Sequence, residues 1–515
     1  MPEVTSTAPL PSRIASLVHS HFDALPNRSK PSIFPDGSRE WIPMTGIVAV
    51  KGMLTGAKCL SASQVPRCRG LVLHDCHAEI LAFRAFNYWL LTECHSFLVE
   101  ELEHKSKSPE SSRSENRSNS TSPFIRRKRR SEHQNHASTS SIDWPPFEIQ
   151  PDVKIYMYCT CAPCGDASME LCMASQEDAT PWEVRRQINV GPDAESAVEE
   201  NLLDGRAHFS LLGIVRRKPA RTDAESTRSK SCSDKIALRQ VSSLLSCETA
   251  RLVAPTANAY LAGFILPEDE ISRVACDRAF GKNGRMAALA GRSWPDINDC
   301  KESEIGFRFR PFDILPVPAE EFQVLWPFAK PKPTDSEFMP KKSKPGNASA
   351  VWTAAPSYLH SCAITPDTGS KTLPVLRRSR TGIYETIING VKQGNKASAP
   401  GPRGASSLSR AKLWALLIDI ITLRTCHTSP DSLADQKQTS KAVTAEQYFG
   451  TPLRTIQYAN TYEDLKRAGG HLEDPVRVRE EAIRGAKEVL KGWIPNTGDE
   501  SWGLDVLSDP KKRKR

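Results

Sequence analysis

Three short segments of the chain carry side chains that could hold a metal ion and move a proton. In the first, residues 73–79 (LHDCHAE), His77 precedes Glu79 by two positions at the start of an expected helix. An imidazole and a carboxylate at this spacing can lie side by side, one binding a metal and the other transferring protons. The pair alone is a weak signal, because a glutamate at a helix start is also favoured by the helix dipole.

Two further segments supply cysteines. Residues 159–168 (CTCAPCGDAS) lead into an expected helix over 167–173, and residues 230–236 (KSCSDKI) place Cys232 just before another. A helix N-terminus lowers the pKa of a thiol and so favours the thiolate that binds metals, which makes Cys164 a candidate ligand. One histidine and two cysteines form a common ligand set for catalytic zinc, with the fourth position left to water. The sequence therefore predicts one Zn²⁺ held by His77, Cys164 and Cys232, with Glu79 beside it.

Other cysteines remain alternative ligands at this stage, namely Cys59, Cys68, Cys76, Cys159, Cys161 and Cys172. Cys161 and Cys164 could also form half of a structural zinc site, although no second Cys-x-x-Cys pair completes it. Without a secretory signal, the remaining cysteines are expected to be buried small hydrophobic residues and not disulfides.

The elements that must position these residues alternate between strands and helices. Short β-branched and apolar runs predict strands over 41–51, 70–73 and 153–158, and in the last of these Val153, Ile155 and Met157 should face one side. Helix-forming residues without Gly or Pro predict helices over 79–91 and 236–245. The order of strand, turn and helix predicts an α/β fold in which helices pack on a mainly buried sheet.

Composition points to an anionic partner and away from a membrane. The 515 residues carry 69 Lys and Arg against 60 Asp and Glu, a formal net charge of +9, which favours nucleic acid. The longest apolar run, near 413–421, is too short to cross a bilayer. The N-terminus lacks the pattern of a secretory or transit signal.

Low-complexity stretches divide the chain. We expect one folded domain over 14–493, a disordered Ser- and Arg-rich insertion over 105–141, a flexible loop over 330–350 and a basic C-terminal tail over 505–515. The basic runs 125–130 and 510–515 each resemble a nuclear-import address, and either could attract RNA phosphates. We therefore expect the nucleus, the cytoplasm or both, with the nucleus favoured.

The motifs at 75–79 (DCHAE), 163–167 (PCGDA) and 231–237 (SCSDKIA), in this order, resemble those of the RNA adenosine deaminases, or editases. In that family the last metal ligand comes from the remote SCSDK motif, which matches the absence of a second cysteine after PCGD here. The resemblance is closest to the eukaryotic tRNA-specific branch that acts on position 37 of alanine tRNA. It covers most of the chain, from about residue 21 to residue 493.

This resemblance implies a cytidine-deaminase-like core, a mixed sheet flanked by helices, and hydrolytic conversion of adenosine to inosine in tRNA. Zinc-bound water would attack C6 of the extruded purine, and Glu79 would move the protons. Lys58 is a candidate substrate contact. No protein partner is indicated. The alternatives are deamination of another structured RNA or of free nucleosides, and a catalytically inactive RNA-binding protein that keeps the fold.

The resemblance also implies a buried inositol hexakisphosphate behind the metal site. By motif position its ligands would include Arg84, Lys235, Arg410, Tyr462, Lys466 and Trp493. Asp75 and Lys235 would form a polar shell that links this cofactor to the metal ligands. The sequence departs from the family at His74, Phe83 and Arg239, where Asn, Arg and Trp are expected.

Overall fold

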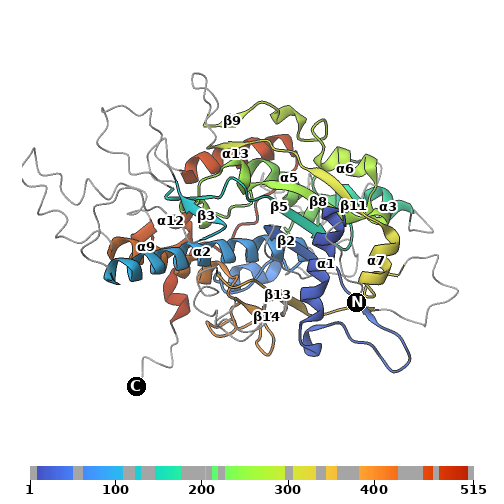
Figure 1. The fold of residues 1–515 in the computed structure, drawn as a ribbon, viewed down its shortest axis with the longest axis horizontal. Coiled ribbons are helices and arrows are strands. Elements are labelled where there is room, and N and C mark those ends of the chain that lie inside the picture. The colour runs from blue at the N-terminus through green and yellow to red at the C-terminus, as the bar shows by residue number, and fades with distance from the viewer. Residues whose placement is uncertain are drawn as a thin grey trace, which may run out of the picture.

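The structure of the chain, a computed structural model, is shown in Figure 1. It describes residues 8–49, 62–107, 122–128, 145–174, 203–204, 211–218, 225, 227–295, 305–331, 344–356, 382–426, 456–467 and 475–508. All structural statements below concern these residues. Among them, no helix combines the length and the apolar character needed to span a membrane.

A four-stranded sheet forms the centre of the molecule, in the order β11, β8, β5, β2. Strands β5 (Ile155–Cys159), β8 (Leu261–Pro267) and β11 (Asp313–Val317) are parallel, and β2 (Thr45–Ala49) is antiparallel to β5. Because the three parallel strands end at one edge of the sheet, the cysteine-rich segment that follows Cys159 begins at that edge.

Helices cover both faces of this sheet (Figure 1). Along β5, Ile155 and Met157 join a core with residues of α2 (Ala78–Lys107) and α5 (Cys232–Ser242). Tyr156 and Tyr158 face the opposite way. The predicted alternation of this strand is therefore confirmed, and the fold is a mixed α/β arrangement in three layers.

The tyrosine face packs against α1 (Leu10–Asp23) and α7 (Ala319–Leu325). Helix α1 begins with Pro11 in its first turn, where the missing N–H costs no hydrogen bond, and buries Ile14, Val18 and Phe22 at four-residue spacing.

The remaining helices include α9, which packs on α2, and α13, which packs on α5. Their bounds are α3 Met169–Ala174, α6 Arg273–Phe280, α9 Arg410–Cys426, α12 Tyr462–Lys466 and α13 Pro475–Val489. The short strands are β1 Glu40–Trp41, β3 Ile125–Arg127, β4 Phe147–Ile149, β6 Leu203–Asp204, β7 Arg216–Arg217, β9 Ser293–Trp294, β10 Phe307–Arg308, β12 Lys344–Pro345, β13 Ser349–Trp352, β14 Tyr384–Ile388 and β15 Val391–Lys392.

Several expected boundaries differ from the structure. Residues 70–73 form a buried turn, not a strand, because Leu73 pairs its N–H with the carbonyl of Gly390 outside any ladder. The predicted disordered insertion 105–141 contains the end of α2 and strand β3, whose Ile125 is fully buried. Local composition missed β3 because a single apolar residue in a basic run anchors it.

The expected flexible loop 330–350 contains β12 and the start of β13. The packed unit also extends past the predicted domain limits of 14 and 493, since α1 starts at Leu10 and the ring of Trp502 stacks on Tyr462. A short 3-10 helix, Leu504–Leu507, falls in the expected basic tail, and residues 509–515 lie outside the described residues.

Candidate active site

The three motif segments converge on one point of the structure. His77 Nδ1 lies 3.5 Å from Cys232 Sγ and 3.8 Å from Cys164 Sγ, and all candidate ligand atoms lie within 4.8 Å of one another. In a tetrahedral site with Zn–S near 2.3 Å and Zn–N near 2.0–2.1 Å, sulfur and nitrogen ligands are about 3.5 Å apart. The arrangement therefore fits a divalent ion with an N and two S ligands.

Hydrogen bonds between backbone groups and side chains join the two cysteine segments. Cys232 N donates to Cys164 Sγ at 3.3 Å, and Ser233 Oγ donates to the carbonyls of Pro163 and Cys164 at 3.1 and 3.0 Å. Gly165 has a φ of 102°, and a Cβ there would lie 2.2 Å from Ser231 Oγ. Only glycine permits this backbone conformation and this close approach, so Gly165 is required for the two segments to meet.

Electrostatics favour a thiolate in this cluster. The pKa of the Cys164 thiol is lowered well below its ordinary range by its hydrogen bond with Cys232 and by the nearby charges of Lys218 and His77. The pKa of the Cys232 thiol is raised, first by burial and then by Cys164. The pKa values of the two thiols thus shift in opposite directions. A divalent cation would stabilise both sulfurs as thiolates.

Glu79 lies in the first turn of α2, two residues beyond His77, and is buried. Burial raises its pKa, and the charges of His77 and Lys218 act in the opposite direction. A buried carboxyl group with a raised pKa beside a candidate metal cluster is suited to accept and donate a proton.

Asp75 organises the polar surroundings of the cluster. Its Oδ1 accepts from the backbone N–H of His77 at 3.0 Å, and its Oδ2 accepts from Ser229 Oγ at 2.9 Å, from Lys218 Nζ at 3.0 Å and from Lys235 Nζ. The structure thus brings together the predicted pair of Asp75 and Lys235. This carboxylate ties the histidine segment to the segment that precedes Cys232.

Lys218 is the residue that sequence reasoning missed at this site. Its buried Nζ donates to Cys232 Sγ at 3.2 Å as well as to Asp75. A cation in contact with a sulfur stabilises the thiolate form. The surrounding sequence, residues 214–218 (IVRRK), gives no signal of this role, because lysines in basic runs are usually solvated.

The alternative cysteines have other surroundings. Among the described residues, Cys76, Cys159, Cys161 and Cys172 join no candidate metal cluster, and Cys59 lies outside them. Cys68, His74 and Asp499 form a second cluster. There the guanidinium of Arg410 lies 2.5 Å from Asp499 Oδ2 and 3.0 Å from His74 Nε2, so the cluster is an ion-pair network already neutralised by a cation.

The predicted polyanion ligands lie behind the metal cluster in several groups. Burial, followed by the nearby charge of Arg410, lowers the pKa of Arg84. The hydroxyl of Tyr462 donates to Glu248 at 2.7 Å. Lys466 lies 3.7 Å from Glu500 and is partly exposed, and both Lys230 and Lys487 lie over the ring of Trp493.

Further cations that the sequence did not single out lie among these residues. Burial and the charges of Arg479 and Arg84 lower the pKa of Arg239 to about 9. Burial and the charges of Lys235 and Lys487 lower the pKa of Lys230 to about 7.

Donors in the same region also lack acceptors, namely Nε and Nη1 of Arg251 and Nε of Arg479, all buried without a hydrogen-bond partner. Buried like charges and orphaned donors are costly unless an anion satisfies them. The cluster therefore has the charge and donors that fit a polyphosphate.

Two predicted RNA contacts gain no support here. Lys58 lies outside the described residues. In the basic run 125–130, Arg126 pairs with Glu148 at 2.7 Å and Arg127 pairs with Glu101, so these two arginines hold β3 in place. They were expected in a disordered segment, and their ion pairs reduce the positive charge that this run offers to a partner.

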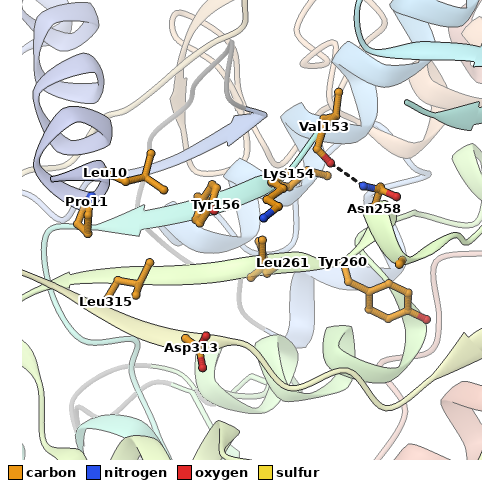
Figure 2. Close-up of a pocket in the computed structure, with 13 residues that line it drawn as sticks. Leu10, Pro11, Val153, Lys154, Tyr156, Asn258, Tyr260, Leu261, Asp313 and Leu315 are labelled. Atoms are coloured by element: carbon orange, nitrogen blue, oxygen red, sulfur yellow. Dashed lines mark hydrogen bonds between the residues drawn. The ribbon is translucent and has the colours of Figure 1, made fainter. Parts of the chain in front are cut away.

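A surface groove of about 540 Å³ lies away from this chemistry (Figure 2). It is lined by the first residues of β5, β8 and β11, where Asn258 Nδ2 donates to the carbonyl of Val153 at 2.8 Å. The metal cluster follows the opposite end of β5. The groove is therefore not part of the candidate active site.

Comparison with known proteins agrees with this geometry. The adenosine-deaminase (editase) domain model matches residues 52–122 and 122–247, a region that contains His77, Glu79, Cys164 and Cys232. A tRNA-specific adenosine deaminase 1 of Schizosaccharomyces pombe is 35% identical over 312 residues, which cover 59% of this chain and 66% of that protein.

More distant relatives include tRNA-specific adenosine deaminase 1 of Saccharomyces cerevisiae, 29% identical over 45% of this chain and 53% of that protein. Double-stranded RNA-specific editase B2 of Rattus norvegicus is 24% identical over 51% of this chain and 32% of its own length. The chain thus spans 66% or less of these relatives. Residues 52–247 of the chain therefore match the adenosine-deaminase (editase) domain, and the chain is similar to proteins named tRNA-specific adenosine deaminase 1.

Proposed function

We propose that this protein deaminates adenosine to inosine in tRNA by zinc-dependent hydrolysis. The observation that carries the proposal is the meeting of His77, Cys164 and Cys232, with Glu79 buried two residues from the histidine. Three ligands from the protein leave one tetrahedral position for water, which is the arrangement of catalytic zinc sites.

The chemistry divides between the ion and the chain. When bound, Zn²⁺ lowers the pKa of a coordinated water toward neutrality and supplies a nucleophile for C6 of adenine. Glu79 takes up the proton that this water loses and delivers it to N1 of the ring, and it then assists departure of the 6-amino group as ammonia. Its raised pKa suits this shuttling. His77 and the two cysteines only hold the ion.

The substrate proposal rests on the relatives. The first relatives named above are described as tRNA-specific, and the net charge of +9 suits a polyanionic partner. We propose position 37 of alanine tRNA, a loop base that can be extruded into the pocket without opening a duplex. Another structured RNA is the main alternative.

Glu79→Gln is the variant that tests the catalytic assignment. We expect it to retain Zn²⁺ and RNA binding but to lose about 10²- to 10⁴-fold in inosine formation, because the amide cannot carry the proton. Glu103→Gln, at an exposed position of the same helix, serves as the matched control. Inosine in alanine tRNA is measured by sequencing, and free adenosine is assayed in parallel. Near-normal turnover by Glu79→Gln would refute the assignment.

We also propose that the cation cluster holds inositol hexakisphosphate, with Arg84, Lys235, Arg410, Tyr462, Lys466 and Trp493 among the groups around it. Arg251 and Arg479 would add donors that are otherwise unsatisfied, and Arg239 would add a further buried cation. Phosphate analysis of protein purified and then denatured tests this directly. Around this cofactor, a cytidine-deaminase-like core is the fold we propose for the central sheet and its helices.

For the cellular compartment we propose the nucleus, on the basic run 510–515. The other run is a weaker candidate because Arg126 and Arg127 are paired with glutamates. Removal of residues 510–515 from a fluorescent fusion should shift it toward the cytoplasm, and an unchanged distribution would contradict the proposal.

A further inference from the structure

Each of the two cysteine segments carries an aspartate two residues after its cysteine. Asp166, at the start of a 3-10 helix (Asp166–Ser168), and Asp234, in the first turn of α5, are both buried, with 1% and 0% of their surface exposed. A buried carboxylate is costly unless cations and donors surround it. The partners of these two side chains therefore decide how the segments sit relative to each other.

One guanidinium group reaches both carboxylates. Arg285 Nη1 donates to Asp234 Oδ1 at 2.6 Å, and Arg285 Nε lies 3.9 Å from Asp166 Oδ2. The Arg285 side chain is itself only 5% exposed. The contact with Asp234 is a hydrogen bond, whereas the contact with Asp166 is an ion pair without one, since neither Arg285 Nε nor Asp166 Oδ2 has a hydrogen-bond partner. The buried guanidinium charge therefore attracts both carboxylates toward one point.

The other partners of these carboxylates act on one segment each. Asp166 Oδ1 accepts from Arg278 Nε at 2.9 Å and from the backbone N–H of Gly213 at 2.8 Å. Asp234 Oδ2 accepts from Ser231 Oγ at 2.6 Å and from the N–H of Arg216 at 3.0 Å. Arg285 forms an ion pair with each aspartate, and the charges of both aspartates also act on Arg216.

The loop after α6 fixes the position of Arg285. Its backbone N–H donates to the carbonyl of Arg278 at 2.8 Å, and the next residue, Met286, is buried. At Gly284 a Cβ would lie 2.4 Å from the oxygen of Arg278, so the loop passes too close to α6 for any other residue. The guanidinium is thus presented from a rigid support.

We propose that Arg285 is a positioning residue for the metal site, which holds the Cys164 and Cys232 segments at the separation that a tetrahedral ion needs. The inference rests on the proposed function, because it assumes that these cysteines bind Zn²⁺. The segments also meet through Cys232 N and Cys164 Sγ, and through Ser233 Oγ and the carbonyls of Pro163 and Cys164. Arg285 adds a contact through the aspartate that follows each cysteine, which further limits how the two segments can move relative to each other.

Arg285→Gln and Arg285→Lys test this inference. Glutamine removes the charge, whereas lysine keeps the charge but can reach only one carboxylate at a time. We expect the dissociation constant for Zn²⁺, measured by competition with a chelator, to rise about 10- to 100-fold for glutamine and less for lysine. Lys282→Gln, an exposed lysine in the same loop, should leave it unchanged.

A spectroscopic measurement separates positioning from general destabilisation. In protein loaded with Co²⁺, both variants should show weaker and shifted visible d–d bands, and kcat on tRNA should fall while KM stays within about twofold. Wild-type zinc affinity and Co²⁺ spectrum in a folded Arg285→Gln would overturn the inference. If Arg285→Gln does not fold, Arg285→Lys decides: an unchanged affinity and spectrum overturn it.

Failure of this inference is distinct from failure of the proposed function. A wild-type protein that binds one Zn²⁺ and deaminates tRNA, with Arg285 variants that bind zinc equally well, overturns only the role of Arg285. A wild-type protein that binds no Zn²⁺ overturns both.

Discussion

The metal cluster and the cation cluster behind it are built in opposite ways. At the metal cluster, charges are balanced: Asp75 faces Lys218 and Lys235, and the carboxylates beyond the cysteines face arginines. In the cation cluster, burial and neighbouring arginines and lysines lower the pKa of Arg239 and of Lys230. The residues of the metal cluster fit a divalent cation, whereas those of the cation cluster fit a polyanion, so the two sites can be tested separately.

Removal of a metal ligand should have the largest effect. His77→Ala should lose bound Zn²⁺ and reduce inosine formation to background, because two sulfurs alone cannot complete the site. Metal analysis and the tRNA assay check this on one preparation. Cys161→Ser is the matched control, since this thiol lies outside the cluster among the described residues. If Cys161→Ser loses the metal and His77→Ala keeps it, the ligand set is wrong.

Substitution of Arg239 should have an effect whose size depends on the polyanion. With a polyphosphate bound, Arg239→Gln should lower the free energy of unfolding by about 1.5–3 kcal/mol, because a charged hydrogen-bond donor is lost. Without one, the loss should be smaller, because relief of repulsion from Arg84 and Arg479 offsets the loss of the hydrogen bonds that Arg239 donates to the carbonyls of Ser243 and Leu245. Chemical denaturation measures the change. A stabilised variant would contradict a resident polyanion, as would the absence of phosphate in the denatured wild type.

The pH dependence of stability should show a smaller effect of the cation cluster. The pKa of Lys230 falls from 10.5 to about 7 on folding when no anion is present, so the unfolded chain binds the extra proton between these values. Stability of the anion-free protein should therefore rise with pH from about 7 to 10, with a slope no steeper than about 1.4 kcal/mol per pH unit.

Lys230→Met should remove the contribution of Lys230 to the slope of stability against pH. This variant therefore distinguishes the titration of Lys230 from that of the cysteines. A bound polyphosphate should also remove this contribution, because the anion keeps the lysine protonated. Denaturation at several pH values, with and without added inositol hexakisphosphate, provides the comparison. An equal slope in the wild type and Lys230→Met would show that Lys230 is not the titrating group.

The metal cluster could be predicted from sequence because its parts are local motifs. His77 and Glu79 are two residues apart, Cys164 precedes a helix and Cys232 begins one, so each short segment shows both the residue types and their position relative to a helix. The alternation of β5 was equally local. Lys218 could not be predicted, since its contact with Cys232 depends on how a separate segment folds back over the site.

The cation cluster shows the limit of such reasoning. Its members come from α2, α5, α9, α12, α13 and segments between helices, and no spacing relates Arg239 to Arg479 or Lys230 to Lys487. The local sequence around a lysine or arginine on a helix does not show whether the side chain is solvated or buried. Likewise, the sequence did not predict β3, because the burial of Ile125 and the ion pairs of two arginines depend on the tertiary structure.

X-ray absorption at the zinc edge reports the ligand atoms of the proposed metal site. We expect one Zn²⁺ per chain with two sulfur ligands at about 2.3 Å and nitrogen or oxygen ligands at about 2.0–2.1 Å. Loss of one sulfur should follow Cys232→Ala in any metal that this variant retains. A shell of four sulfurs, or one with nitrogen and oxygen alone, would contradict the site formed by His77, Cys164 and Cys232.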